Sequence, residues 1–191
     1  MYIRTLPLAA VAAALTLASC DEVGVPVNQT VDGATFEFTI PAGTTETVYE
    51  LVQSVATEDV AQQLADAGID NVTIEEITIE GVRVEIENGV VDAAEAAQLL
   101  YLNNVEDLTV SINDTDVASR ALQIATFAAV TGQDVTSAAL HAVKDVDVAS
   151  YLRADRITGR TSIKLKEAIE LKEAATVKIT AKYNVKAKVG V

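Results

Sequence analysis

The last segment of the chain, residues 177–189, alternates strictly between apolar and polar residues, which suits only one regular conformation. Successive side chains point to opposite faces of a β-strand, whereas a helix would scatter them around its axis. Such a strand needs a surrounding sheet to bury its apolar face. The apolar face comprises Val177, Ile179, Ala181, Tyr183, Val185, Ala187 and Val189, and the polar face Lys178, Thr180, Lys182, Asn184, Lys186 and Lys188.

Other segments share this two-residue period. Residues 34–40 alternate up to a Pro-Ala-Gly turn, and residues 108–112 alternate between aliphatic and hydroxyl side chains. Residues 47–55 fit a helix or a strand; we favour the strand, although it places Gln53 on the apolar face. Residues 116–143 fit either a helix ending at a glycine or a pair of strands, and their periodicity leaves both interpretations open.

Residues 72–87 carry a clear strand signal whose phase slips twice. The aliphatic residues change parity near residues 75–76 and change back near residues 80–81. One extra residue in a strand restores the apolar face after such a slip, so we expect a β-bulge at each point. The alternative is two strands joined by a tight kink at Gly81.

Short helices are expected between the strands. Residues 58–67 follow Thr57 as an N-cap and precede Gly68, which favours the left-handed conformation that ends helices. Residues 92–102 are rich in alanine and begin with an Asp-x-x-Glu capping box. Residues 147–154 predict a third, shorter helix.

The N-terminus has the parts of a secretory signal. Arg4 provides a positive charge, residues 6–17 are apolar, and Leu17-Ala18-Ser19-Cys20 follows. This tetrapeptide resembles the lipobox of bacterial lipoproteins. The resemblance implies cleavage before Cys20 and attachment of acyl chains to its sulfur and its new amino group. Two or three acyl chains make a lasting membrane anchor, whereas a single chain binds reversibly.

The lipobox divides the chain into three parts. Residues 1–19 are expected to be a signal peptide, residues 20–33 a lipidated tether and residues 34–191 a β-rich globular domain. Pro26 argues against regular structure in the tether. Lipidation of Cys20, the only cysteine, leaves no thiol for a disulfide, a metal site or a nucleophile.

Charge is distributed unevenly along the chain. Residues 21–150 hold 24 acidic and three basic residues, a net charge of −21, whereas residues 151–191 hold four acidic and ten basic residues, a net charge of +6. The whole chain carries −14. Nucleic acids and anionic lipid surfaces require clustered basic residues, so we expect neither as a partner of this acidic chain.

Motifs that support catalysis are few. His141 is the only histidine, and the sequence has no Gly-x-Ser-x-Gly, His-Glu-x-x-His, P-loop or Gly-x-Gly-x-x-Gly motif. We therefore expect no cofactor and no catalytic site, and a hydrolase with two carboxylates distant in sequence is our third hypothesis. Two oxygen-rich clusters lack EF-hand spacing and are expected to form turns and caps. They comprise Asp66, Asp70 and Asn71, and Asn113, Asp114 and Asp116.

The lysine face of the last strand has two interpretations. It lies in solvent beside acidic strands or guards a sheet edge, or it binds an anionic partner such as a lipopolysaccharide phosphate or an acidic polysaccharide. The acidic body of the chain would repel a polyanion, which favours the first. We expect this strand to share a sheet with the glutamate-rich residues 72–87. The lysines are Lys178, Lys182, Lys186 and Lys188.

The order of these elements is similar in pattern to small β-sandwich lipoproteins of Gram-negative envelopes. The expected fold is a β-rich α+β domain, an antiparallel β-sandwich with several short helices. The expected role is a non-catalytic binding or structural module on the cell envelope, with a carrier of an apolar ligand as the alternative. Asp21 resembles an inner-membrane retention signal in one sorting scheme and a surface-export signal in another; we favour the outer membrane or the cell surface.

Overall fold

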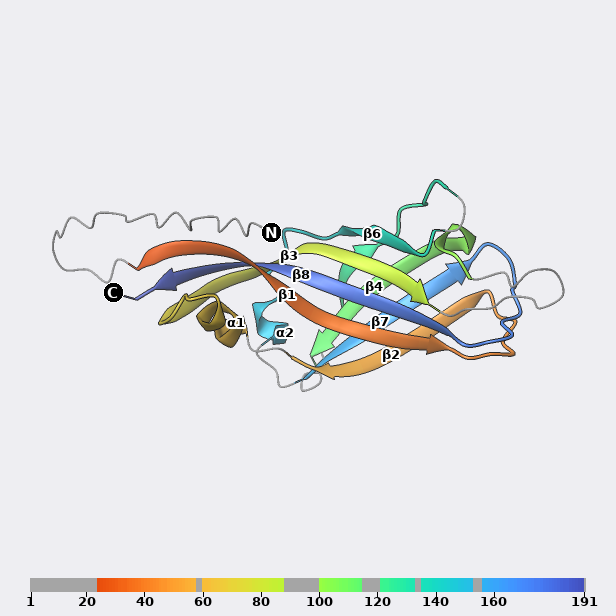
Figure 1. The fold of residues 1–191 in the computed structure, drawn as a ribbon, viewed down its shortest axis with the longest axis horizontal. Helices are drawn as coiled ribbons and strands as arrows, with labels where there is room; N and C mark the ends of the chain where they lie inside the picture. Colours follow the sequence, from red (N-terminus) through yellow and green to blue (C-terminus); the bar gives the residue numbers. More distant parts are fainter. Residues whose placement is uncertain are drawn as a thin grey trace, which may run out of the picture.

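The alternating C-terminal segment forms β8 (Ala175–Val189), which lies between β1 (Val25–Ile40) and β3 (Val72–Glu87) (Figure 1). Both ladders are antiparallel and run along nearly the whole of β8. Alternate residues from Ala175 to Ala187 are buried, and the polar side chains lie on the opposite face. The strand predicted from the two-residue period is confirmed.

The computed structural model describes residues 24–57, 60–87, 100–114, 121–132, 135–152 and 156–190. Antiparallel strands dominate these residues, and the helices are short, so the expected β-rich class is confirmed. The remaining elements are β2 (Val48–Ala56), α1 (Val60–Asp66), a 3-10 helix (Leu102–Asn104), β4 (Val105–Asp114), β5 (Leu122–Thr126), β6 (Ser137–Ala142), α2 (Ala149–Leu152) and β7 (Arg156–Leu165).

All eight described strands belong to one sheet, in the order β1-β8-β3-β6-β5-β4-β7-β2. Only two residue pairs join the half β1-β8-β3-β6 to the half β5-β4-β7-β2. These pairs, between β5 and β6, are Ala125–Ala142 and Thr126–His141. The sheet curls until its edge strands β1 and β2 come into contact (Figure 1). The expected division into the two sheets of a sandwich is not confirmed, since the described strands form one continuous order.

Two β-bulges interrupt the β3–β8 ladder. The register shifts between Ile74 and Glu76, and again between Ile79 and Gly81. Each bulge adds one residue to β3 and returns the following aliphatic residues to the buried face. Both bulges lie where the phase slips predicted them. The alternative of two strands kinked at Gly81 is wrong, because β3 continues through this residue.

β1 begins earlier than the sequence pattern indicates. The predicted tether over residues 20–33 is wrong from Val25 onward, because this part of β1 pairs with β8. Pro26 is tolerated because β1 is an edge strand. The register shows which way the backbone of Pro26 points. Glu37 pairs with Lys178 and directs its N–H away from β8, toward Gln53 Oε1 of β2. Pro26 pairs with Lys188, on the same face of β8, so its nitrogen also points away from β8 and no hydrogen bond of the ladder is lost.

The segments that fitted both a helix and a strand contain strands where the structure describes them. The strand interpretation of residues 47–55 is confirmed by β2, and β5 and β6 show that the described parts of residues 116–143 include strands. α1 confirms the helix predicted before Gly68, whose φ is +82°. α2 lies within residues 147–154. The helix predicted over residues 92–102 falls mostly outside the described residues.

Two glycines let aromatic rings pack against the strands. A Cβ atom on Gly159 of β7 would lie 2.5 Å from Cδ1 of Phe36, which projects from β1. Gly33, within the β1 bulge, lies equally close beneath the Tyr183 ring of β8. Phe36 and Tyr183 are almost fully buried among aliphatic side chains. A larger residue at Gly159 would require the Phe36 ring to move, and one at Gly33 would also meet the carbonyl oxygen of Ala181 at 2.9 Å.

Thr161 of β7 provides a test of core packing. Its side chain is fully buried, and its Oγ1 has no hydrogen-bond partner in the part of the chain that the structure describes. Valine keeps the shape and removes the unsatisfied hydroxyl, so we expect Thr161→Val to raise the free energy of unfolding by about 1 kcal/mol. Denaturant unfolding followed by circular dichroism measures this change.

The matched control is Thr158→Val, which alters the outward face of the same strand. Its effect should stay below about 0.5 kcal/mol in either direction, as is usual at surface positions. A Thr161→Val protein less stable than the native chain would contradict the account of an unsatisfied hydroxyl.

Candidate functional site

The most highly charged surface that the sequence predicts is the lysine face of β8. Lys178, Lys182, Lys186 and Lys188 all project from the side of β8 opposite to its buried residues. Because β1 and β3 pair with β8 on either side, their outward residues flank these lysines. This surface, which we call the lysine face, therefore lies within a three-stranded layer and not at its edge.

Each of the four lysines has a carboxylate partner on a neighbouring strand. β1 contributes two partners: Asp32 Oδ1 lies 3.5 Å from Lys182 Nζ, and Glu37 Oε1 lies 4.0 Å from Lys178 Nζ. β3 contributes the other two. The remaining ion pairs join Lys186 to Glu76 and Lys188 to Glu75.

The first bulge of β3 makes the last two ion pairs possible. Glu75 and Glu76 are consecutive, and in a regular strand their side chains would point to opposite faces. The extra residue between Ile74 and Glu76 interrupts this alternation, so both carboxylates reach lysines of β8. The same bulge thus keeps the aliphatic face buried and doubles the negative charge opposite the end of β8.

The Lys186–Glu76 contact is a charge-assisted hydrogen bond. The hydrogen bond to Glu76, and then the charge of that carboxylate, raise the pKa of the Lys186 ammonium above its usual value of 10.5. Because the pKa is raised in the folded state, the ion pair contributes to stability below pH 10.5. That contribution is lost as the pH rises through the raised pKa.

These ion pairs agree with the first interpretation of the lysine face, a solvated face beside acidic strands. The proposed position of β8 beside residues 72–87 is confirmed. An anionic partner would have to compete with four carboxylates that already contact the lysines. Binding of a lipopolysaccharide or polysaccharide anion at Lys178, Lys182, Lys186 and Lys188 stays a prediction without further support from the geometry.

The other sequence candidates are not brought together. His141 lies exposed on β6, opposite Thr126. Asp66 accepts a hydrogen bond from Gln62 within α1, and Asn71 adopts a turn conformation with φ of +54°. Within the described ranges, no group of three or more His, Cys, Asp or Glu residues is placed to hold a metal ion. Cys20 and Asp116 lie outside the described residues.

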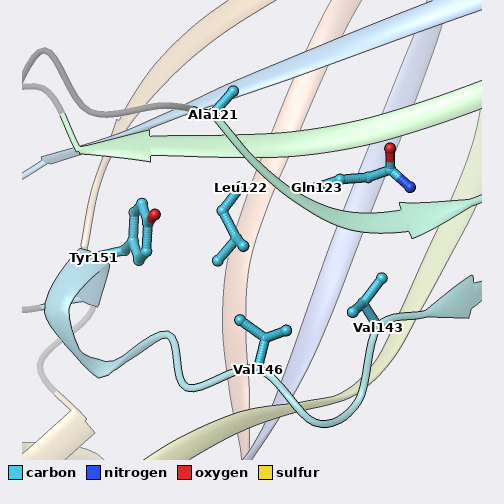
Figure 2. Close-up of a pocket in the computed structure, with 6 residues that line it drawn as sticks. All are labelled: Ala121, Leu122, Gln123, Val143, Val146 and Tyr151. Atoms are coloured by element: carbon cyan, nitrogen blue, oxygen red, sulfur yellow. The ribbon is translucent and has the colours of Figure 1, made fainter.

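A shallow hollow of about 590 Å³ lies beside β5 and α2 (Figure 2). Leu122 of β5 and Val146 of the segment before α2 point toward each other across it, with Tyr151 and Val143 on its sides. Ala121 and Gln123 complete the lining. Sequence patterns did not predict this hollow. Four of its residues come from residues 116–143, whose secondary structure the periodicity left open, and they meet Val146 and Tyr151 only through the tertiary structure.

Comparisons with known proteins leave the family open. No protein-family model and no curated protein matches the chain. Among solved structures, it aligns with a chain of the empty head of turnip yellow mosaic virus at 10% identity, covering 98% of this chain and 91% of that one. The TM-score is 0.25, which carries no argument about fold or function. None of the described helices has the length and apolar character needed to cross a membrane.

The ion pairs of the lysine face predict a salt-dependent stability. We expect replacement of all four lysines by glutamine to lower the melting temperature in low salt. The effect should be much smaller in about 1 M salt, where the screening length falls to roughly 3 Å. Differential scanning calorimetry at both salt concentrations provides the measurement, and equal losses would show that the lysines act through packing instead.

A charge swap separates local pairing from the change in net charge. Lys186→Glu and Glu76→Lys each place like charges opposite one another and should be destabilising. The double variant keeps the native net charge and restores the pair, so it should regain most of the lost stability. Additive losses in the double variant would contradict the assigned Lys186–Glu76 contact.

Proposed function

We propose that this chain is a lipid-anchored protein of the bacterial cell envelope that acts as a non-catalytic binding or structural module. The favoured location is the outer membrane or the cell surface. The anchor is assigned to Cys20 from the lipobox resemblance. One observation supports the structural role: β1 starts at Val25, only five residues after Cys20 in the chain, so an anchor on Cys20 would be linked to the sheet by a short segment.

The short tether has a mechanical consequence. Five residues of extended chain span at most about 17 Å. A lipid on Cys20 would therefore hold the Val25 end of β1 close to the bilayer. Val25 and Val72 both pair with Val189, so the same end of the layer contains the start of β3 and the end of β8. A surface held this close to lipid suits a structural contact better than the capture of large soluble substrates.

We also propose that the described strands, together with the intervening segments, form one sandwich-like domain. The layers would be β1-β8-β3-β6 and β5-β4-β7-β2, which are linked by only two residue pairs. The contact of Phe36 in the first layer with Gly159 in the second supports this arrangement. A β-sandwich packs two such layers face to face over an apolar core.

A carrier of an apolar ligand is the second candidate, favoured by the hollow between β5 and α2. Its volume of about 590 Å³ falls within the range of small-molecule sites, and its exposed lining is polar and apolar in equal parts. Val143, Val146, Leu122 and Tyr151 would contact an acyl chain or a similar group. No observation of the described residues gives comparable support to a carboxylate-based hydrolase.

The anchor is tested by Cys20→Ser. This variant should incorporate no radiolabelled palmitate and should remain unprocessed by the lipoprotein pathway, because the thiol that accepts the lipid is absent. His141→Ala is the matched control and should be labelled like the native protein. Label that persists in Cys20→Ser would overturn the lipobox assignment.

The carrier role is tested by solvent extraction of the purified protein followed by mass spectrometry. A carrier should release a lipid in near-stoichiometric amount, and Val146→Asp should reduce that amount several-fold by placing a charge in the hollow. Lys144→Asp changes an exposed residue of the same segment and provides the control. A native protein free of lipid would count against the carrier.

A further inference from the structure

The outer edge of β1 is long and makes almost no hydrogen bonds, although part of it contacts β2. β1 spans 16 residues and has a strand neighbour, β8, on one side only. Along its other edge, the described chain makes one hydrogen bond, from the Glu37 N–H to Gln53. Natural proteins usually protect such edges with charged side chains, prolines, β-bulges or short strands. In β1, Pro26 lies near the start, and Asp32 and the bulge that follows it come after Thr30, so residues 27–31 between them carry no such feature.

The open groups of this edge follow from the register. Asn28, Thr30 and Asp32 pair with residues of β8 on the same face as Lys178, the partner of Glu37. Since the Glu37 N–H points outward, the N–H and C=O groups of these three residues point outward as well. Their side chains are exposed. α1 does not fill this edge, because its contacts with both β1 and β3 place it across the face of the layer (Figure 1).

We propose that this edge binds the same edge of a second copy of the chain. The two β1 strands pair antiparallel around a two-fold axis at Thr30. Each Thr30 lies opposite its counterpart, and each Asn28 lies opposite Asp32 of the other copy. All three residues then donate and accept a backbone bond, and the Asn28 amide donates to the facing carboxylate. Such an interface is isologous and closed, so it produces a dimer and no fibre.

The side chains select this register over its neighbours. An axis at Asp32 would place two carboxylates directly opposite each other, which is unfavourable. An axis at Asn28 would bring Pro26 into the ladder, where it has no N–H to donate. With the axis at Thr30, Pro26 falls opposite Ala34, which lies within the bulge that ends this part of β1. Threonines facing each other across strands are also a favourable pair.

This inference rests on the proposed structural role and names its partner. In the antiparallel pair, the two Val25 residues lie ten strand positions apart, about 33 Å. Two short tethers reach one bilayer when the two-fold axis is normal to it. Each copy carries a net charge of −14, so the copies repel at low salt and pair more readily as salt screens that repulsion.

Disulfide trapping tests the pairing in the full chain. Cys20→Ser removes the only native thiol, and Thr30→Cys then places one thiol at the axis. Facing residues of a hydrogen-bonded antiparallel pair have Cα atoms about 5.5 Å apart, within disulfide range. We expect mild oxidation to convert most of this protein into a covalent dimer. Asn184→Cys, the neighbour of Thr30 on β8, should stay monomeric.

A second measurement uses no cysteine at all. Sedimentation velocity of the Cys20→Ser chain should show a dimer that increases with salt. Thr30→Lys places two ammonium groups opposite each other and should weaken dimerisation by about tenfold or more, a difference of about 1.4 kcal/mol. Asn184→Lys adds the same charge one strand away and should have a much smaller effect. Circular dichroism confirms that each variant retains its β-sheet.

Two results would each overturn the proposed dimer. Thr30→Cys that remains monomeric, or that crosslinks no faster than Asn184→Cys, overturns the proposal, as does a native chain that sediments as a monomer at all salt concentrations. Because every protein in the crosslinking experiment lacks the anchor, a missing dimer and a missing lipid label are separate results. Failure of one does not imply failure of the other.

Discussion

The structure depends on the insertion of β8 between β1 and β3. β1 has no other strand partner among the described residues, so without β8 its buried face and its backbone groups lose their neighbours. The aliphatic face of β8 is buried from Ala175 to Ala187 and forms the centre of one half of the core. β7 has the equivalent place in the other half, between β2 and β4. Each half of the sheet is therefore completed by one of the last two strands of the chain.

This topology also explains the uneven charge. The acidic residues come early in the chain and the basic ones late, so the early strands would repel one another if they paired without β7 and β8 between them. Once inserted, Lys164 of β7 pairs with Glu106, and the lysines of β8 pair with carboxylates of both flanking strands. Each exposed pair contributes only about 0 to 1 kcal/mol. Their arrangement nevertheless favours the native strand order, because a misplaced acidic strand would meet another acidic strand.

The outer edge of β1 has a hydrogen-bond partner at one end and none among the described residues at the other. Where β1 and β2 approach, the Gln53 side chain accepts the Glu37 N–H and replaces a ladder bond. Gln53 is the residue that falls on the apolar face of the strand predicted over residues 47–55, and this contact gives a physical reason for a polar residue there. The Val25 end of β1 has no equivalent partner in the described chain, and it is also the end nearest to the predicted anchor. We therefore expect the proposed binding role to involve the backbone edge of β1 more directly than the lysine face.

The sequence by itself determined the local features: β8, the two bulges of β3, α1 with its glycine stop, and the pairing of lysines with the glutamates of residues 72–87. Each follows from the period of neighbouring side chains, from charge, or from the conformational freedom of one residue. Only the tertiary structure decided that β1 starts at Val25, because a proline is excluded from a central strand but tolerated at an edge, and edge position depends on distant segments. The strand order, the partner of Gln53 and the hollow beside α2 were likewise decided by long-range packing. Residues far apart in the chain meet there, and no local pattern records which of them will be neighbours.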